Sequence, residues 1–159
     1  MIILSSGARL AGFNATGLKA AMANGIIYVY TGPQPATADA AVQGTLLMKI
    51  TKDAGAFAFG TSTNGLNFDA PTVSGNNILL AKAAAENWQG VAIAAGVPGW
   101  FRHMANPTDA LGVSTSLPRI DGTVGNAGSD LIIVGTSFEI GTPETVVSYQ
   151  LSWAAFRST

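Results

Sequence analysis

Short runs of β-branched and aromatic residues recur along this chain, and glycine or proline residues mark the end of most of them. Both residues favour turns, and the 19 glycines and 7 prolines are enough to punctuate about ten short strands. Repeated short strands with little helix are typical of a β-sandwich or a β-barrel. We therefore predict an all-β fold, a jelly-roll-like β-sandwich, with strands at residues 26–30, 45–51, 66–68, 78–82, 87–95, 99–106, 117–123, 130–134, 137–140 and 145–153.

Two parts of this pattern carry more detailed predictions. Residues 87–95 and 99–106 read as a hairpin, because the Gly-Val-Pro-Gly sequence that joins them at 96–99 is a turn. In the last run, apolar residues alternate with small or amide side chains. Alternation with period two places one face of a strand against a core. We expect that face to carry Val147, Tyr149, Leu151 and Trp153.

Helix signals are confined to the N-terminal part of the chain. Residues 16–24 are the one good helix candidate, and Thr16 is the expected N-cap. Residues 1–13 are predicted to be an arm, followed by a single β-sandwich domain at residues 14–159. The apolar start of the arm suits either strand addition to a neighbouring subunit or an edge strand of its own domain.

The chain carries little charge for its length. Only 11% of its 159 residues are Asp, Glu, Lys or Arg, against about 25% in a typical soluble domain. Two interpretations remain open: a neutral, hydrated surface, or a surface covered by other subunits. The net charge of −1 comes without a basic stripe, which argues against nucleic-acid binding. Continuous apolar runs such as residues 91–95 are too short to span a membrane, so no membrane partner is expected.

No set of residues in the sequence forms a recognisable catalytic motif. The absence of cysteine excludes disulfides and thiolate chemistry. The single histidine, His103, has no acidic residue in the same predicted strand, so we expect it to have a packing or hydrogen-bonding role. The acidic residues are dispersed, and the glycine-rich stretch at 122–130 lacks the spacing of a phosphate-binding loop. We therefore expect no enzyme activity, no cofactor and no metal site.

Arg102 shares one face of a predicted strand with two apolar neighbours, Trp100 and Met104. If this face points inward, the guanidinium needs a partner, because an unpaired buried charge is costly. We predict a buried ion pair with Asp121, and Asp130 is the alternative partner. The competing interpretation is a solvated face near the edge of the sheet.

Large apolar and aromatic residues supply the candidate contact surface. Trp100 and Trp153 are expected in the core, where a β domain commonly uses large aromatic side chains. Trp88 begins a strand and is the tryptophan expected to reach an interface. The predicted interface residues are Ile2, Ile3, Leu4, Arg9, Phe13 and Trp88.

Several segments, spread over most of the chain, occur in a recognisable order. They are residues 25–42, 44–47 (Gly-Thr-Leu-Leu), 64–68 (Asn-Gly-Leu-Asn-Phe), 88–90, 95–96, 99–102 and 117–125. In this order they resemble a group of small virion proteins of tailed bacteriophages. The parts that depart from the group are the N-terminal arm and residues 156–159, where contacts specific to one partner are expected.

The resemblance implies a capsid decoration, or cement, protein. Such a protein binds the outer surface of the head and bridges copies of the major capsid protein, commonly as a homotrimer that gains affinity by multivalency. The implied location is the capsid surface of the virion, after assembly in the host bacterial cytoplasm. The alternatives are a tail or head–tail junction subunit, and a tail-borne carbohydrate- or receptor-binding module that uses Trp88 or Tyr30. We expect deletion of residues 1–13 to leave a folded domain that assembles less well.

Overall fold

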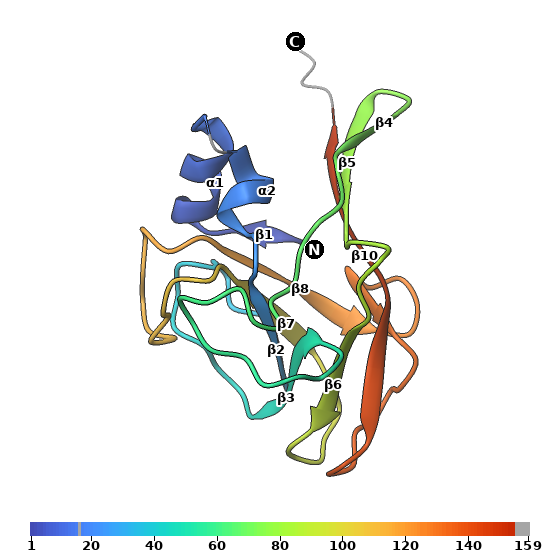
Figure 1. Ribbon diagram of the computed structural model, residues 1–159. Helices are drawn as coiled ribbons and strands as arrows, with labels where there is room; N and C mark the ends of the chain where they lie inside the picture. Colours follow the sequence, from blue (N-terminus) through green and yellow to red (C-terminus); the bar gives the residue numbers. More distant parts are fainter. Residues whose placement is uncertain (16, 155–159) are drawn as a thin grey trace.

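The computed structural model describes residues 1–15 and 17–154 of a chain that is mostly β. Seven strands close into a barrel, so the predicted all-β class is confirmed (Figure 1). They are β2 (Ile26–Tyr30), β3 (Leu46–Lys52), β6 (Trp88–Ala92), β7 (Trp100–Met104), β8 (Arg119–Gly125), β9 (Leu131–Ile133) and β10 (Pro143–Ala154). Three further strands extend the sheet: β1 (Ile3–Leu4), β4 (Thr72–Ser74) and β5 (Asn77–Ala81).

Hydrogen bonding around the barrel follows the order β8-β7-β2-β3-β6-β10. Strand β9 closes the circle, because it pairs with β10 on one side and with β8 on the other. The β8–β9 pairing is parallel, and the other pairings of the barrel are antiparallel. Closure satisfies the strand edges that an open sheet would expose to other chains.

The main hydrophobic core fills the barrel. Ile27 and Val29 of β2 point inward, beside their cross-strand partners His103 and Phe101 of β7. Alternation along β2 should then send its other side chains to solvent. All five residues of β2 are nevertheless buried, and so are all five of β7.

A second apolar cluster on the outer face of the barrel explains this burial. Its buried members are Ile26, Tyr28, Tyr30, Trp100 and Met104. The loops at residues 31–45 and 105–118 cover the cluster and are joined to each other, since the Val42 amide donates to the Leu111 carbonyl at 3.0 Å. The barrel therefore has an inner core and an outer one, and long loops close the outer one.

The N-terminal segment is not an extended arm throughout. Residues 6–13 form helix α1 (Ser6–Phe13), which begins at Ser5, the N-cap. The Ser5 hydroxyl accepts a hydrogen bond from the Ala8 amide at 3.0 Å, as an N-cap should. Strand β1, just before it, pairs with β8 of the same chain, which is the second of the two interpretations given to this apolar segment.

The predicted helix at residues 16–24 is present in a shorter form. Helix α2 (Gly17–Ala21) covers its middle, and Asn24 adopts a positive φ of 55° after the helix. The expected N-cap Thr16 lies outside the described residues, as does the segment at 156–159.

Strands β6 and β7 do not form the predicted hairpin. β6 pairs with β3 and β10, whereas β7 pairs with β2 and β8, so two strands separate them. The glycine-rich connection crosses the end of the barrel instead, where Gly96 forms an isolated bridge with Phe138. Phe138 lies in the predicted strand at 137–140, which is reduced to this bridge.

The inward face of β10 differs from the predicted one. A β-bulge between Val146 and Ser148 inserts an extra residue. Val146 and Tyr149 are therefore buried, while Val147 is 58% exposed. A bulge shifts the alternation by one residue, so the simple period-two pattern assigns the wrong valine to the core.

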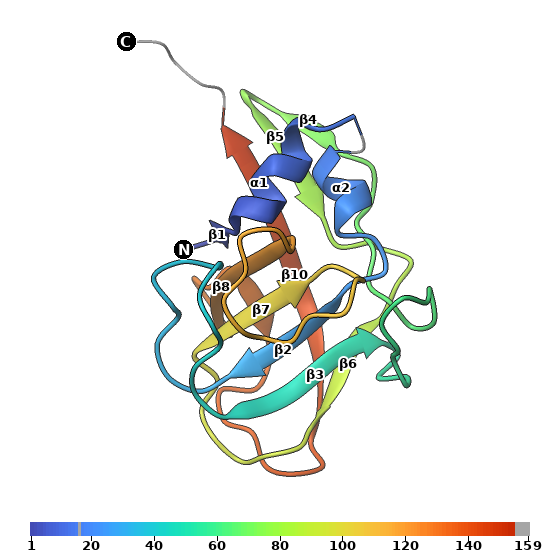
Figure 2. The same ribbon diagram turned by 90° about the vertical axis from the view of Figure 1, so that its left-hand side faces the viewer.

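The far end of β10 leaves the barrel. Its residues 150–154 pair with β5, and β5 pairs with β4, which makes a three-stranded extension. This extension stands beside α1 and α2 at the same end of the molecule (Figures 1 and 2). None of the helices in the described part of the chain is long and apolar enough to cross a membrane.

Candidate functional site

The outer face of the barrel contains a fully buried ion pair. Arg102 donates from Nε to Asp121 Oδ1 at 2.8 Å and from Nη2 to Asp121 Oδ2 at 2.7 Å. Both side chains are inaccessible to solvent, so the predicted pair is confirmed. Nη1 donates to the Ala40 carbonyl at 2.8 Å, which ties a covering loop to the strand. Asp130, the alternative partner, accepts hydrogen bonds from Thr123 instead.

A second buried ion pair lies next to the first. Arg119 donates from Nε and Nη2 to the two carboxylate oxygens of Asp109, each at 2.6 Å. Nη1 donates to the Gly112 carbonyl at 2.9 Å. Sequence reasoning missed this pair, because Asp109 lies in a loop without any pattern that marks it as buried. Since the charged groups of both pairs are mutually satisfied and hidden from solvent, their role is to fix the covering loops.

His103 lies inside the barrel among aromatic rings. The ring centroids of Phe68, Trp88 and Tyr149 lie 5.5, 5.8 and 5.7 Å from that of His103. Burial lowers the pKa of His103 to about 3, so the ring is neutral at ordinary pH. Neither ring nitrogen has a hydrogen-bond partner among the described residues. A neutral imidazole without access to solvent has a packing role here.

The described residues contain no group of three or more His, Asp or Glu side chains that could bind a metal ion.

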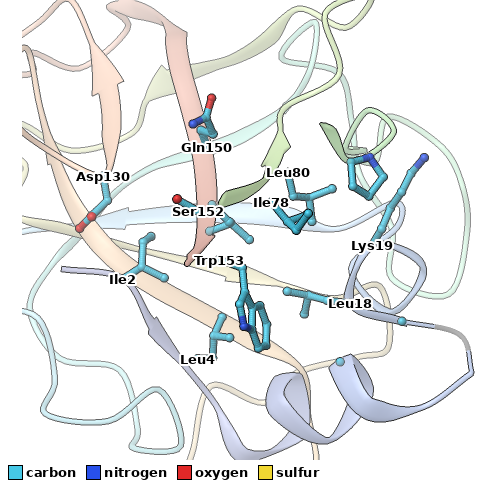
Figure 3. A pocket seen from close by; sticks show the side chains of 14 residues that line it. Ile2, Leu4, Leu18, Lys19, Ile78, Leu80, Asp130, Gln150, Ser152 and Trp153 are labelled. Atoms are coloured by element: carbon cyan, nitrogen blue, oxygen red, sulfur yellow. The ribbon is translucent and has the colours of Figure 1, made fainter. Parts of the chain in front are cut away.

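An apolar groove of about 650 Å³ lies between the two helices and the sheet extension (Figure 3). We call it the apolar groove. Its apolar lining comes from four elements that are far apart in the sequence: β1, α2, β5 and β10. The apolar side chains that line it include Ile2, Leu4, Leu18, Ile78, Leu80 and Trp153.

Two strands flank the apolar groove: β1 on one side and residues 150–153 of β10 on the other. Strands β1 and β9 lie in line along the same edge of β8. β9 also pairs with β10, at residues 146–149, whereas the pairing of β1 within the described part of the chain is with β8. Beyond β9, residues 150–154 of β10 pair with β5. The apolar groove therefore lies where β10 leaves the barrel, between β1 and the sheet extension.

The polar groups of the apolar groove lie at its margins. Asp130 at one end forms an ion pair of 2.7 Å with the Met1 ammonium. Burial alone would raise the pKa of Asp130, but hydrogen bonds from this ammonium and from Thr123 lower it below its usual value. Lys19 is exposed on the helical side, together with Gln150 on the strand side. The floor between these groups is apolar.

The structure brings some of the predicted interface residues to the apolar groove. Ile2 and Leu4 line it, and their neighbour Ile3 is half-buried on the same short strand. Arg9 and Phe13 are exposed on α1, and Phe13 is 82% accessible. These five positions remain compatible with a contact surface.

The structure contradicts the predicted exposure of Trp88 at an interface. Its side chain is fully buried in the barrel, and its indole N–H donates to Glu86 Oε2 at 2.9 Å. The position after a polar turn suggested exposure, but the barrel closes over the start of β6 and places the ring against Phe68 and Tyr149. Trp88 therefore cannot reach a partner.

The prediction for Trp153 is also wrong, but in the opposite sense, because this side chain is more exposed than expected. It was expected in the core, yet it is 39% exposed and lines the apolar groove. Its ring lies 3.9 Å from the position that a Cβ at Gly12 would occupy, so it reaches across to α1. Apolar and polar residues do alternate along β10, but the strand leaves the barrel before Trp153, so this side chain does not reach the core.

Four further exposed apolar residues lie in connections near the start of β10, whereas the apolar groove lies at the end of this strand. They belong to the connections after β6 and β9, which meet where Gly96 bridges Phe138. We call this set the distal patch, and it consists of Ile93, Val97, Val134 and Ile140. Exposed apolar side chains also occur elsewhere on the described surface, for example at Val73 and Val113.

Comparison of the chain with protein-family models, with curated proteins and with solved structures gives no match. The functional assignment therefore depends on the geometry above and on the charge content of the chain.

Proposed function

We propose that this chain is a structural subunit of a bacteriophage virion that binds the outer surface of the capsid and stabilises contacts between copies of the major capsid protein. The observation that carries the proposal is the apolar groove at the end of β10, with the distal patch near the start of that strand. Burial of such surface favours association by roughly 25 cal/mol per Å² before the costs of ordering are subtracted. Only 11% of the residues are charged, so contacts between charged groups can contribute little to the binding of a partner.

The sequence resemblance to small virion proteins of tailed bacteriophages supports the virion as the setting. A homo-oligomer, with a trimer as the expected form, would present several copies of the same surface to a symmetric shell. The proposed location is the capsid exterior, reached after assembly in the host bacterial cytoplasm. No catalytic step, cofactor or nucleic-acid contact forms part of this proposal.

The test is the mass of the purified chain, measured by light scattering, together with co-sedimentation with empty shells of the major capsid protein of the same virus. We expect a stable oligomer that sediments with the shells. An oligomer that ignores shells but binds isolated tails would favour the alternative of a tail or head–tail junction subunit. A chain that binds neither would contradict a role in the virion.

The structure argues against the two aromatic residues that were candidates for carbohydrate binding. Trp88 and Tyr30, the two aromatic residues considered for a sugar platform, are both buried. Stacking on a sugar ring needs an accessible aromatic face. We therefore rank this alternative below both structural roles.

A further inference from the structure

We infer that residues 1–13 act as a clasp: while docked, they hold the first loop (residues 31–45) and the second loop (residues 105–118) closed over the outer apolar cluster, and their release lets the loops open. This conformational device goes beyond the proposed function and does not depend on it. The contacts between the clasp and the two loops carry the inference, together with two polar groups that the loops enclose.

The first loop is attached to the start of helix α1 through Asp39. Its carboxylate accepts a hydrogen bond from the Ser6 amide at Oδ1 and another from the Ser6 hydroxyl at Oδ2, each at 2.7 Å. Burial alone would raise the pKa of Asp39, but the hydrogen bonds from Ser6 lower it below its usual value. The carboxylate is therefore charged at neutral pH, and a negative charge beside the first turn of a helix also interacts favourably with the helix dipole.

The second loop is attached to the clasp at Ser5 and Gly7. The buried Ser5 hydroxyl donates to the Leu117 carbonyl at 2.8 Å and accepts from the Arg119 amide at 2.8 Å. Gly7 lies so close to the main chain of Ser116 and Leu117 that a Cβ at this position would overlap it. The start of α1 therefore packs directly on the end of the second loop, with no room for a larger residue.

The two loops are also joined to each other. The Ser114 amide donates to the Asp39 carbonyl at 2.9 Å, and the Val42 amide donates to the Leu111 carbonyl at 3.0 Å. Asp39 thus contacts the clasp through its side chain and the second loop through its main chain. Because each part is bonded to the other two, we expect the clasp and the loops to open together, as one cooperative unit of local unfolding.

The closed loops enclose two polar groups that have no hydrogen-bond partner among the described residues, the Tyr30 hydroxyl and the Trp100 indole N–H. The two rings are stacked, with their centroids 4.7 Å apart, and both side chains are buried. A buried polar group without a partner lowers the stability of the closed state, because water would hydrogen-bond it in the open state. Contacts elsewhere must offset this cost, and the clasp supplies such contacts.

The barrel does not need the loops in order to stay folded. Arg102 and Asp121 are cross-strand partners on β7 and β8, so their ion pair does not require the first loop, which contributes the Ala40 carbonyl. Arg119 and Asp109 connect β8 to the second loop through two hydrogen bonds of 2.6 Å. We therefore expect opening to be a local event in which the first loop moves further than the second.

The experiment is hydrogen exchange of the full-length chain under native conditions, followed by two-dimensional NMR. Four protons report on the clasp and the loops: the indole N–H of Trp100 and the amide N–H groups of Ser6, Val42 and Ser114. The indole N–H of Trp88, which is bonded to Glu86 and belongs to a side chain buried in the barrel, reports on the barrel. After correction for intrinsic exchange rates, we expect the four protons to share one opening equilibrium and to exchange at least about 10-fold faster than Trp88.

Two variants weaken the clasp at different points, and each has a matched control. Asp39→Ala removes both acceptors of Ser6, and its control is Glu139→Ala, at an exposed carboxylate. Gly7→Ala forces α1 away from the second loop, and its control is Gly12→Ala in the same helix, where a Cβ has its nearest neighbour at 3.9 Å. Each clasp variant should accelerate exchange at Trp100 by about 5-fold or more, and neither control should. Far-UV circular dichroism confirms that each variant is folded.

A barrel variant shows whether opening is local. Ile50→Val shortens a side chain that is fully buried in the barrel. It should accelerate exchange at Trp88 by about 2- to 10-fold, because Trp88 becomes accessible when the barrel unfolds. Exchange at Trp100 should not change, because Ile50 stays buried when only the clasp and the loops open.

Three results would overturn the inference. One is equal protection of Trp100 and Trp88 in the wild-type chain, and another is equal acceleration of both by Ile50→Val, since either would mean that the loops open only when the barrel unfolds. The third is an unchanged exchange rate at Trp100 in a folded Asp39→Ala or Gly7→Ala variant, which would mean that the clasp does not hold the loops. None of these measurements involves shells or tails, so they stand apart from the test of the proposed function.

Discussion

Arg102 and Asp121 have no contact with water, so each depends on the other for charge compensation. The variant Asp121→Asn would remove one charge and leave a buried guanidinium unpaired. We expect it to lower the free energy of unfolding by about 3–5 kcal/mol, the usual effect of breaking a buried pair. Denaturant unfolding followed by tryptophan fluorescence measures this change.

A matched control is available at Asp53, an exposed residue with a φ of 54°. Asparagine tolerates this left-handed conformation, so Asp53→Asn should change stability by less than about 0.5 kcal/mol. The double variant Arg102→Met/Asp121→Leu should recover much of the loss, because it removes both buried charges. Equal stability of Asp121→Asn and the wild-type chain would contradict a structural role for the pair.

His103 gives the barrel a defined response to acid. Burial lowers its pKa from 6.5 to about 3, so the folded chain keeps it neutral where the unfolded chain would protonate it. The stability linked to this group is therefore complete above pH 6.5 and is lost as the pH falls toward 3. The slope should approach about 1.4 kcal/mol per pH unit in that window.

The measurement is the unfolding free energy at several pH values, for the wild-type chain and for His103→Leu. Contributions from the carboxylates are common to both proteins, so the difference between the two curves reports His103 alone. The difference should be flat above pH 6.5 and should change steadily below it. A constant difference down to pH 3 would show that His103 is not held neutral by the fold.

Among the elements, helix α1 shows how a helix can escape sequence analysis. Its large apolar residues, Leu10 and Phe13, point outward and are 64% and 82% exposed. Its buried face consists of small residues, Gly7, Ala8 and Ala11. The usual signal of an inward apolar stripe is therefore absent. The sequence therefore predicted an arm at residues 1–13, where the structure has a helix capped by Ser5.

Gly7 sets how closely α1 approaches the rest of the molecule. A Cβ at this position would overlap the main chain at Ser116 and Leu117. We expect Gly7→Ala to destabilise the protein by about 1–3 kcal/mol, as overpacking does, although alanine is the better helix former. Thermal unfolding by circular dichroism measures the effect.

Gly12 in the same helix is the control, since a Cβ there has its nearest neighbour, the Trp153 ring, at 3.9 Å. Gly12→Ala should be neutral or should stabilise by up to about 1 kcal/mol, because glycine costs roughly that much within a helix. If both substitutions had the same sign of effect, the close approach at Gly7 would not control the packing of α1.

For the whole molecule, the low charge content makes a prediction about the forces of assembly. Association by apolar burial is only weakly affected by screening, whereas contacts between exposed charges are weakened when the Debye length falls from about 10 Å at 0.1 M salt to about 3 Å at 1 M. We expect the mass of the oligomer and its co-sedimentation with shells to be unchanged between these salt concentrations. Light scattering and sedimentation at the two concentrations are the measurements. Dissociation at high salt would show that charged contacts hold the assembly together.

Sequence alone determined the properties that depend on local residue types. The β-branched runs between glycines and prolines predicted the all-β class, and β2 has the bounds that were expected for it. The position of Arg102 between two apolar neighbours predicted a buried charge, and the structure supplies its partner. Charge content and the absence of cysteine followed from composition.

The tertiary structure decided which strands are neighbours and which faces are covered. Closure of the barrel buries Trp88, while departure of β10 from the barrel exposes Trp153. The bulge in β10 exchanged Val147 for Val146 in the core. The apolar groove arises from four elements brought together by folding, so no local pattern could have shown it. Local propensities act over a few residues, whereas burial is set by pairing between residues that lie tens of positions apart in the chain.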